Sequence, residues 1–461
     1  MARSKALKGR GKPKADLDMK AFRAAQVVRK RMRTKRKEIA RAGFLTEPSR
    51  QLDLLRKAGI VAAHNPDQKA WRALIPPETK LPPGRPNLWF TLAPELGYLI
   101  GVDIAHQEVS VSITRADFGK LLDHVRRVPV DGLDGNPEHA LDAAAELIRD
   151  VFGQVSRSEG ATAEQVIGIG MGLPGPVNRE SKTISPEMHI LSAWSNRKPT
   201  FELSERLQDI LPEVPIEVDN DASLGALGVH SWKTLTSNPD TVPRDLLYVR
   251  VGDGIGAGVV IKGKLVGGGS GFAGEIGHVK IDDRGSFCPR CGQRGCVETK
   301  TSERAVLAEL TTAVFAEAQE KVTIATVIAS DHPACFRSLH EAGWHLGAAL
   351  AHARTLLDPT RIYIGGRMAH SDRFMRAIRE GIVSNSLDLA MEVEALVVPS
   401  PRGLPKRRPD LGSAELLGAI AIALHRCGDG YIEGRLRHYM DREITKSDES
   451  GELVSATGAA K

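Results

Sequence analysis

The chain has 461 residues, of which 26% are charged and 41% hydrophobic, and its formal net charge is +6. This length predicts two or three domains, each with its own core. No run of about 18 apolar residues occurs, which excludes a membrane-spanning helix. The N-terminus lacks the apolar stretch of a secretory signal, so we expect a cytoplasmic protein with no membrane partner.

Positive charge is concentrated at the N-terminal end of the chain. Residues 1–61 contain 19 Lys or Arg and five Asp or Glu, a net of +14, which leaves residues 62–461 with a net of −8. Such an imbalance indicates a nucleic-acid-binding module attached to a separate body. A solvated basic tail is the alternative, and we expect a disordered tail of this kind in residues 1–15 only.

Residues 16–80 are predicted to form a winged helix-turn-helix domain. Apolar residues recur at helical spacing from Asp16, a second short helix ends near Gly43, and a third is expected from about Glu47 to Ala58. Three short helices with a glycine-containing turn before the third are typical of the helix-turn-helix motif, although three-helix bundles also serve other functions.

The third helix would enter the major groove of duplex DNA, where Arg and Gln can contact guanine and adenine edges. Residues 60–75 could form a hairpin wing. Residues 81–95 form either a plain linker or a segment whose Gly84-Arg85-Pro86 reaches the minor groove. The candidates for DNA contact are Arg36, Lys37, Ser49, Arg50, Gln51 and Arg85.

From Pro94 onward, strand-like and helix-like segments alternate, as is typical of an α/β domain. Helices are expected in residues 137–155, in much of 303–358 and in GSAELLGAIAIALH, and residues 441–461 are expected to be a disordered tail. The predicted strands and turns include GYLIGVDIA, EVSVSIT, VIGIGMGLPGPV, PIEVDNDAS and DLLYVRVGDGIGAGVVIKGKL.

Three of the five cysteines lie within nine residues, in HVKIDDRGSFCPRCGQRGCVE. In a reducing compartment, clustered thiols are more often metal ligands or redox groups than disulfides. Cys288, Cys291 and Cys296, with His278, form a Cys3His set suited to tetrahedral zinc, with no open coordination position. We therefore predict one structural Zn²⁺ per chain. Free cysteines are the alternative, and a redox pair would lack its usual βαβ setting.

These motifs, together with GIGMGLPGPV and IYIGGRMA in their order along the chain, resemble the ROK family (repressors, open reading frames and kinases) over about residues 95–425. The resemblance implies an actin-like (ribonuclease H-like), two-lobed sugar-kinase fold, with lobes at 96–222 and 223–440 and a sugar cleft between them. It also implies the same four zinc ligands. The family usually spaces its first two cysteines as CxC, whereas this chain has Cys288-Pro289-Arg290-Cys291.

The resemblance further implies which side chains hold the sugar hydroxyls. Carboxylates, an amide and a histidine can bind hydroxyls in paired hydrogen bonds. His278 would use one ring nitrogen for zinc and the other for a hydroxyl. Glu275 and Glu298 could instead be solvated surface carboxylates. The implied sugar contacts are Asn220, Asp221, Glu275, His278 and Glu298.

Two turns decide between a kinase and a sensor. In a kinase, Asp221 would be the general base, but the same carboxylate can bind a sugar that never reacts. Asp103 is followed by Ile104-Ala105-His106-Gln107 where a kinase of this family has a Gly-Gly-Thr-type turn, and Asp253 stands where a kinase has Thr. A carboxylate repels a triphosphate. Because phosphoryl transfer depends on positioning and electrostatics, we predict that phosphotransfer is lost.

The sequence thus predicts a sugar-responsive, DNA-binding transcriptional regulator, a repressor of carbohydrate-utilisation genes rather than an enzyme; activation stays open. A homodimer or homotetramer would read a pseudo-palindromic operator with half-sites about one helical turn, or a multiple, apart. Glucose, xylose, N-acetylglucosamine and other sugars all stay open as effectors. The alternatives are an ATP-dependent, glucokinase-like sugar kinase with a basic extension, and a protein-binding scaffold. The transcriptional-regulator branch of the family, with its N-terminal helix-turn-helix, favours the first reading.

Overall fold

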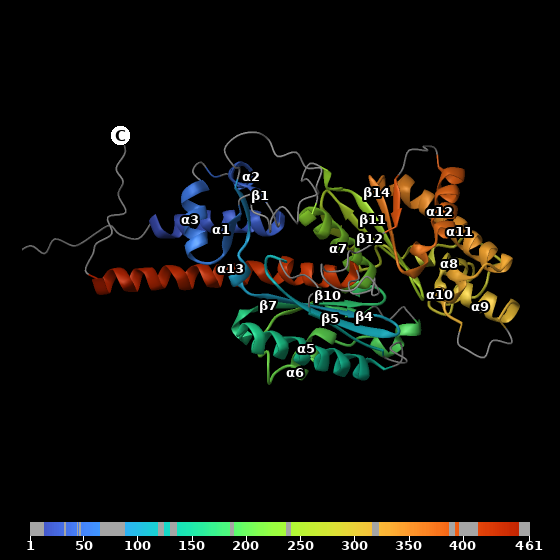
Figure 1. Ribbon diagram of the computed structural model, residues 1–461, viewed down its shortest axis with the longest axis horizontal. Coiled ribbons are helices and arrows are strands. Elements are labelled where there is room, and N and C mark those ends of the chain that lie inside the picture. The colour runs from blue at the N-terminus through green and yellow to red at the C-terminus, as the bar shows by residue number, and fades with distance from the viewer. Residues whose placement is uncertain are drawn as a thin grey trace, which may run out of the picture. The chain divides into compact units, whose positions relative to one another are not determined.

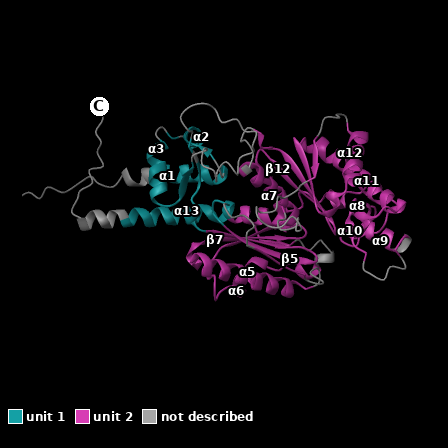
Figure 2. Ribbon diagram, in the orientation of Figure 1, with its two compact units in different colours: residues 1–97, 115–119, 424–461 teal, residues 98–114, 120–423 magenta. Residues whose placement is uncertain are grey.

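The computed structural model forms two compact units, coloured separately in Figure 2. One unit, called the head, comprises residues 1–97, 115–119 and 424–461; the other, called the body, comprises residues 98–114 and 120–423. The residues described by the structure are 13–31, 34–43, 45, 48–64, 88–118, 124–129, 136–184, 189–236, 241–315, 322–386, 392–395 and 414–450.

The head combines three helices with a small antiparallel sheet, as a winged helix-turn-helix requires. Its helices are α1 (Pro13–Arg31), α2 (Arg36–Ala42) and α3 (Pro48–Lys57). Its strands, in sheet order, are β1 (Thr34–Lys35), β3 (Trp89–Leu92) and β2 (Val61–His64). Ala25, Val28, Ile39, Leu52 and Leu55 are buried, so the apolar positions at helical spacing do form the core of the head.

The second strand of the wing lies further along the chain than expected. β2 pairs with β3, with Val61 opposite Leu92 and His64 opposite Trp89. The prediction of a linker over residues 81–95 is therefore wrong for residues 89–92, which complete the sheet of the head. Residues 65–87 lie outside the described residues, and the predicted contact through Arg85 lies there too.

The last helix, α13 (Ala414–Ser450), contributes to both units, because its residues up to 423 belong to the body and the rest to the head. The expected end of the second lobe at residue 440 is therefore too late. Residues 441–450 were predicted to be a disordered tail, but they continue this helix. At the other end of the chain, α1 already begins at Pro13, inside the predicted tail.

Within the head, a buried arginine joins α1 to α13. Arg29 is 2% exposed, and its Nη1 donates to the carbonyl oxygens of Leu424 at 3.0 Å and His425 at 2.7 Å. Its Nη2 forms an ion pair with Asp429 at 2.8 Å. Because a guanidinium is costly to bury without partners, this contact makes the C-terminal segment an integral part of the head.

The first lobe of the body is built on a five-stranded sheet with the order β10-β7-β4-β5-β6. Helices α5 (Pro137–Glu159) and α6 (Pro199–Arg206) cover one face of this sheet (Figure 1). β4, β7 and β10 are parallel, whereas β5 and β6 are antiparallel. The strands are β4 (Tyr98–Ile104), β5 (Glu108–Arg115), β6 (His124–Pro129), β7 (Val166–Leu173) and β10 (Ile216–Asn220).

The second lobe has a sheet of the order β13-β12-β11-β14-β15, with helices on both faces. Leu246 and Tyr248 pack toward α7, and Leu247 and Val249 pack toward α11 and α12, because successive side chains of a strand point to opposite faces. The strands are β11 (Leu246–Val251), β12 (Ile255–Ile261), β13 (Lys264–Val266), β14 (Arg361–Gly365) and β15 (Val393–Ala395). The helices are α7 (Asp221–Thr236), α8 (Glu298–Thr301), α9 (Glu303–Ala313), α10 (Ile324–Ala329), α11 (Pro333–Leu357) and α12 (Asp372–Asn385).

Short elements complete the body. They are the two-stranded sheet of β8 (Val177–Asn178) and β9 (Thr183–Ile184), and the 3-10 helices η2 (Ala163–Gln165), η3 (His189–Trp194), η5 (Ile276–His278) and η6 (Arg367–His370); η1 (Pro94–Leu96) lies in the head.

Glycines bring the start of α13 against both lobes. A Cβ on Gly170 of β7 would lie 1.9 Å from the carbonyl oxygen of Ala419, and one on Gly418 would lie 1.8 Å from that of Leu224 in α7. Real Cβ atoms do not approach oxygen so closely, so only glycine permits this packing. The two sheets are therefore fixed around a shared helix, and the cleft described next lies between their carboxyl ends.

Candidate functional site

A cleft lies between the two lobes of the body. All five side chains that the sequence assigned to sugar contact line it. The lining also includes three ionisable side chains that were not predicted: His106, Arg250 and Arg290. The predicted site residues therefore do come together in space, although they come from segments up to 78 residues apart (Asn220 to Glu298). Concave sites with a few convergent polar groups are typical of small-ligand binding.

Asn220 and Asp221 are placed by the junction between β10 and α7. Asn220 Nδ2 donates to the carbonyl oxygen of Gly175 at 2.9 Å, and its Oδ1 accepts from the backbone N–H of Ser223 at 2.9 Å. Asp221 Oδ1 accepts from the N–H of Ala222 at 2.7 Å. Because these bonds run to the backbone of the first turn of α7 and of the loop at Gly175, both side chains are held in fixed orientations at the start of the helix.

Arg250 neutralises the carboxylate that a kinase would use as its base. Its Nη1 donates to Asp221 Oδ2 at 2.7 Å, and its Nε lies 3.3 Å from Glu415 Oε1, which also accepts from the hydroxyl of Tyr248 at 2.6 Å. Burial opposes the charge of Arg250, but the neighbouring carboxylates of Asp221 and Glu415 raise its pKa above the usual value. The sequence analysis missed this pair. Its signal was a charged residue inside the otherwise apolar strand LLYVRV.

Glu275 and Glu298 are not solvated surface carboxylates. Glu298 is 1% exposed, and it accepts a hydrogen bond from the Cys288 thiol at 3.0 Å. The side chain of Glu275 is 17% exposed, and its Oε2 lies 3.8 Å from His278 Nε2. Burial, with the nearby Asp221 and Glu298, raises the pKa of Glu275 to about 8. At neutral pH this carboxyl group is mostly protonated and can donate a hydrogen bond.

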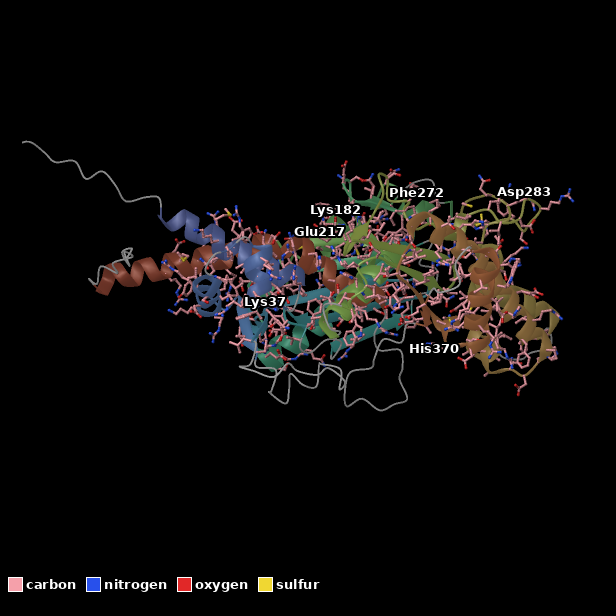
Figure 3. All side chains as sticks on the ribbon, turned by 90° about the horizontal axis from the view of Figure 1, so that it is seen from above. Lys37, Lys182, Glu217, Phe272, Asp283 and His370 are labelled. Atoms are coloured by element: carbon pink, nitrogen blue, oxygen red, sulfur yellow. The ribbon has the colours of Figure 1, made fainter. Side chains whose placement is uncertain are left out.

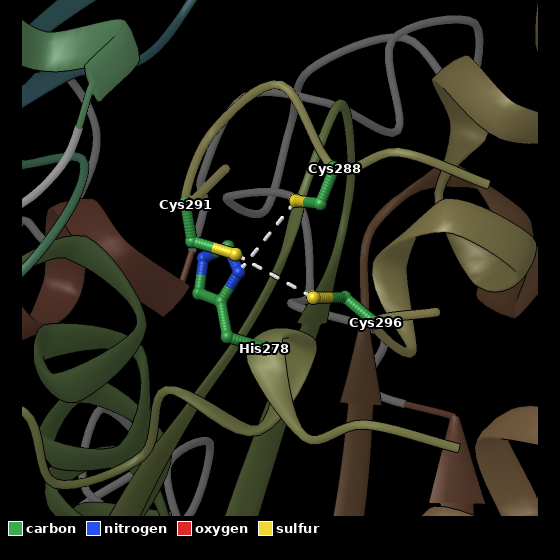
Figure 4. Close-up of side chains that lie close together, drawn as sticks. All are labelled: His278, Cys288, Cys291 and Cys296. Carbon is green, nitrogen blue, oxygen red and sulfur yellow. Dashed lines mark hydrogen bonds between the residues drawn. The ribbon is translucent and has the colours of Figure 1, made fainter. Parts of the chain in front are cut away.

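The four predicted metal ligands lie together beside the cleft (Figure 4). Their ligand atoms are all within 4.8 Å of one another, with Cys291 Sγ 3.5 Å from Cys296 Sγ and Cys288 Sγ 3.8 Å from His278 Nδ1. Tetrahedral zinc with Zn–S bonds of about 2.3 Å separates its sulfurs by roughly 3.8 Å. The donor types and spacing therefore fit zinc, including Cys288 of the longer CxxC spacing.

The loop around the cluster closes through glycine. Gly292 and Gly295 have φ of 74° and 72°, and a Cβ on Gly295 would lie 1.6 Å from the carbonyl oxygen of Asp282. Asp283 lies at the outer tip of this loop (Figure 3). The left-handed backbone conformation of Gly292 and Gly295 lets the loop bend back and bring the cysteines together.

The histidine of the cluster is already in the form that binds a metal, whereas the cysteines must first lose their protons. Burial lowers the pKa of His278, which leaves a neutral imidazole able to coordinate a cation. Burial raises the pKa of the Cys296 thiol to about 11, and burial with the hydrogen bond to Glu298 raises the pKa of Cys288 still further. Since the thiolate is the form that binds zinc, loading the site would release protons.

Arg290 connects two turns on opposite walls of the cleft. Its Nη1 lies 3.0 Å from Nε2 of His106, in the turn between β4 and β5, and its Nη2 lies 2.9 Å from Oδ2 of Asp253, in the turn between β11 and β12. These are the two turns in which the sequence departs from the kinase pattern. Arg290 was not among the predicted site residues, although the extra residue of the CxxC spacing is visible in the sequence.

The head exposes most, but not all, of the predicted DNA contacts. Arg36, Lys37, Ser49 and Arg50 are exposed, and Arg36 Nη1 donates to the hydroxyl of Ser49 at 3.2 Å. Gln51 is only 6% exposed, so the prediction that it reads a base edge is wrong: its position on α3 turns its side chain into the head.

Within the described segments, no helix is both long enough and apolar enough to cross a membrane.

Comparisons with known proteins agree with this architecture. The sequence profile of the ROK family matches residues 99–420. The chain is 25% identical over 334 residues to the xylose repressor of Caldicellulosiruptor bescii, covering 68% of this chain and 78% of that protein. It is 27% identical over 300 residues to the glucokinase of Halalkalibacterium halodurans, covering 61% of this chain and 84% of that protein.

A solved structure extends the likeness to nearly the whole chain. The structure of a ROK family transcriptional regulator, described as a homolog of the E. coli MLC protein, matches with a TM-score of 0.63 and 20% identity, over 91% of this chain and 99% of that chain. This similarity shows the fold: a two-lobed α/β body preceded by an N-terminal region.

Proposed function

Because the chain belongs to the ROK family, we propose that it is a sugar-responsive, DNA-binding transcriptional repressor of carbohydrate-utilisation genes, and not an enzyme. The observation that carries this proposal is the 2.7 Å pairing of Arg250 with Asp221 in the sugar cleft. The cleft keeps the polar groups that bind a sugar, while the carboxylate that would activate the sugar for phosphoryl transfer is held by a cation.

A general base must present a basic lone pair to the proton it removes. Both oxygens of Asp221 are engaged, Oδ1 by the N–H of Ala222 at 2.7 Å and Oδ2 by Arg250. The same carboxylate can still accept a hydrogen bond from a bound hydroxyl, so its pairing impairs chemistry more than it impairs recognition.

The turns near Arg290 support the same conclusion. Phosphates are held by backbone N–H groups and cations placed to receive them. In this chain the space between the two turns contains the Arg290 guanidinium, with His106 and Asp253 as its partners. A triphosphate would have to displace these contacts and lie beside the carboxylate of Asp253.

For the effector we propose a sugar held by Asn220, Asp221, Glu275, His278 and Glu298. A largely protonated Glu275 and the Nε2 side of His278 would add to the acceptors of Asp221 and Glu298, so that hydroxyl groups find both donors and acceptors. The xylose repressor among the relatives supports a monosaccharide of five or six carbons. Glucose, xylose and N-acetylglucosamine are the effectors to test first.

We propose one structural zinc per chain, held by His278, Cys288, Cys291 and Cys296. It would supply a rigid support, since all four positions of a tetrahedral ion are filled by protein. His278 would bind through Nδ1, which faces the thiols, and keep Nε2 toward Glu275 and the cleft. Glu298 begins α8 just after Cys296, so the same loop positions two sugar contacts.

The head would bind duplex DNA through α2 and α3. Exposed Arg36, Lys37, Ser49 and Arg50 supply phosphate and base-edge contacts, and Arg85 stays a predicted contact in the adjoining segment. A homodimer or homotetramer would place two heads on a pseudo-palindromic operator.

The test is binding of the purified full chain to the DNA upstream of its own gene, followed by mobility shift at low salt, with and without each of the three sugars. We expect a shifted complex that one sugar weakens, and an affinity that falls steeply with salt. A head that gives no complex with duplex DNA even at low salt, or a complex that none of a broad sugar panel alters, would contradict the proposal.

A sugar kinase is the second candidate, favoured by the glucokinase among the relatives and by the retained Asp221. A coupled assay for ADP release with the same sugars distinguishes the two. Turnover that exceeds the background and disappears in Asp221→Asn would make the protein an enzyme and overturn the sensor assignment.

A further inference from the structure

Arg290 joins three parts of the body that otherwise belong to different elements. It lies between Cys288 and Cys291 in the metal loop and is 5% exposed. Its guanidinium contacts His106 of the first lobe at 3.0 Å and Asp253 of the second lobe at 2.9 Å. Its Nε faces Glu298 Oε2 at 3.6 Å. One side chain therefore connects both walls of the cleft to the loop that carries the metal ligands.

The backbone of the second lobe is shaped to receive this side chain. A Cβ on Gly254 would lie 3.1 Å from the guanidinium carbon of Arg290 and 3.0 Å from Glu298 Oε2. Such distances are tighter than ordinary van der Waals contact, so glycine at this position lets the guanidinium lie flat against the turn. The contact is therefore a fitted one rather than a chance approach of a long side chain.

The energetics make these contacts depend on the separation of the lobes. A buried guanidinium is stable only when its hydrogen-bonding groups are matched, and a planar fork can hold two partners at once. A hydrogen bond is lost when its atoms separate by more than about 3.5 Å. Opening the cleft by a few ångströms would therefore break the contact to His106, whereas the ion pair between Arg290 and Asp253, which lie on the same lobe, would remain.

We propose that Arg290 is an interlobe latch, a positioning residue that stabilises the closed cleft and links closure to the metal loop. The inference rests on the proposed function in one respect, because a closed cleft would retain a bound sugar. The contacts of Arg290 themselves require neither sugar nor DNA. Zinc on the cysteines at either side of Arg290 would fix the backbone from which the latch extends. Because the CxxC spacing places Arg290 between two metal ligands, the loop would both bind the metal and hold the two lobes together.

The latch is tested first without any ligand, by amide hydrogen exchange in the full zinc-loaded chain. The reporters are two backbone N–H groups. That of Ala105 donates to the carbonyl oxygen of Glu108 at 2.9 Å, and that of Gly252 donates to the carbonyl oxygen of Gly254 at 3.0 Å. We expect Arg290→Ala to accelerate exchange at these two turns at least tenfold. Arg284→Ala, which removes an exposed arginine of the same loop, should change neither.

The second measurement is sugar affinity by titration calorimetry with xylose, glucose and N-acetylglucosamine. We expect Arg290→Ala to weaken binding of the effector at least tenfold. The affinity of Arg290→Lys should lie between those of the parent chain and Arg290→Ala, because one ammonium group cannot contact both His106 and Asp253. Adding His106→Ala to Arg290→Ala should weaken binding no further, since the two residues share one interaction. Zinc content, measured in every variant, should stay at one per chain.

The outcomes separate the latch from the proposed function. If Arg290→Ala keeps its zinc and both its exchange rates and its sugar affinity stay within twofold of the parent chain, the latch is refuted. If Arg290→Ala loses zinc, the exchange rate at Gly252 in His106→Ala decides, because this variant removes the first-lobe partner of Arg290 without changing the metal loop. If the parent chain binds none of the sugars but the exchange contrast persists, the sensor proposal fails and the latch stands.

Discussion

The cleft and the head place their charged residues in opposite ways. In the cleft, Arg250 and Arg290 are enclosed and matched to carboxylates at 2.7 and 2.9 Å, whereas Arg36, Lys37 and Arg50 of the head lie exposed on α2 and α3. Enclosed charges fix geometry, because each is stable only with its partner in place. Exposed charges attract a polyanion over a distance and are screened by salt. In the proposed function, the same residue types would serve recognition of a small neutral ligand in one region and attraction of DNA in the other.

The largest effect expected from this contrast concerns the metal loop, which carries Arg290, one of the two enclosed arginines. Cys296→Ser should lower zinc affinity by roughly 100-fold or more and weaken sugar binding with it, because Glu298 follows Cys296 by two residues. Metal analysis after dialysis and calorimetry would measure both. Cys335→Ser is the control, since it alters a buried thiol outside the cluster; a Cys296→Ser chain that retains one zinc would show that the four-ligand assignment is wrong.

The next effect concerns the stability of the body. Arg250→Ala leaves Asp221 and Glu415 without their cation and should lower the free energy of unfolding by about 3 kcal/mol, the usual result of breaking one side of an enclosed pair. Chemical denaturation at constant pH measures the change. Arg244→Ala, at an exposed position near the start of the same strand, should have little effect. If Arg250→Ala and Arg244→Ala had the same free energy of unfolding, enclosed and exposed arginines would not differ in their contribution to stability.

The smallest effects are expected in the head. Unlike effects in the cleft, those of the exposed residues of the head should depend on salt concentration. Arg50→Ala should weaken operator binding by about 1–3 kcal/mol if it contacts a base, and flatten the salt dependence if it contacts a phosphate. Gln51→Leu should leave DNA affinity unchanged, because the side chain is already enclosed in the head. Fluorescence anisotropy with labelled operator at several salt concentrations tests both, and a large loss in Gln51→Leu would restore Gln51 as a contact.

The features that could be predicted are those that depend on the residue pattern of a short stretch of sequence. The helical spacing of Ala25 and Val28, the strand β7 and the metal-ligand set of His278 and three cysteines follow from short stretches of sequence, and the structure has them where expected. The sugar constellation was available through the family resemblance, and its residues do meet in one cleft.

The parts that could not be predicted depend on contacts between distant segments. β3 pairs with β2 across residues 65–88, and its sequence follows a proline-rich stretch that suggests a linker. Arg290 meets His106 over 184 positions. No local periodicity encodes such a pairing. Gln51 was misassigned for a different reason: a helix turns about 100° per residue, so one position separates an exposed side chain from an enclosed one.

The clasp between Arg29 and the carbonyl groups near residue 424 has a consequence for biosynthesis. Two segments that are far apart in the sequence form one folding unit, so a nascent segment that contains Arg29 lacks its partners until the ribosome has translated past Asp429. Premature termination would yield a product in which that guanidinium has nothing to bind. Because residues 424–461 of the head follow the body in the sequence, the head can be completed only after the body has been synthesised. Chains that stop early should therefore bind the targets of the head more weakly than complete ones.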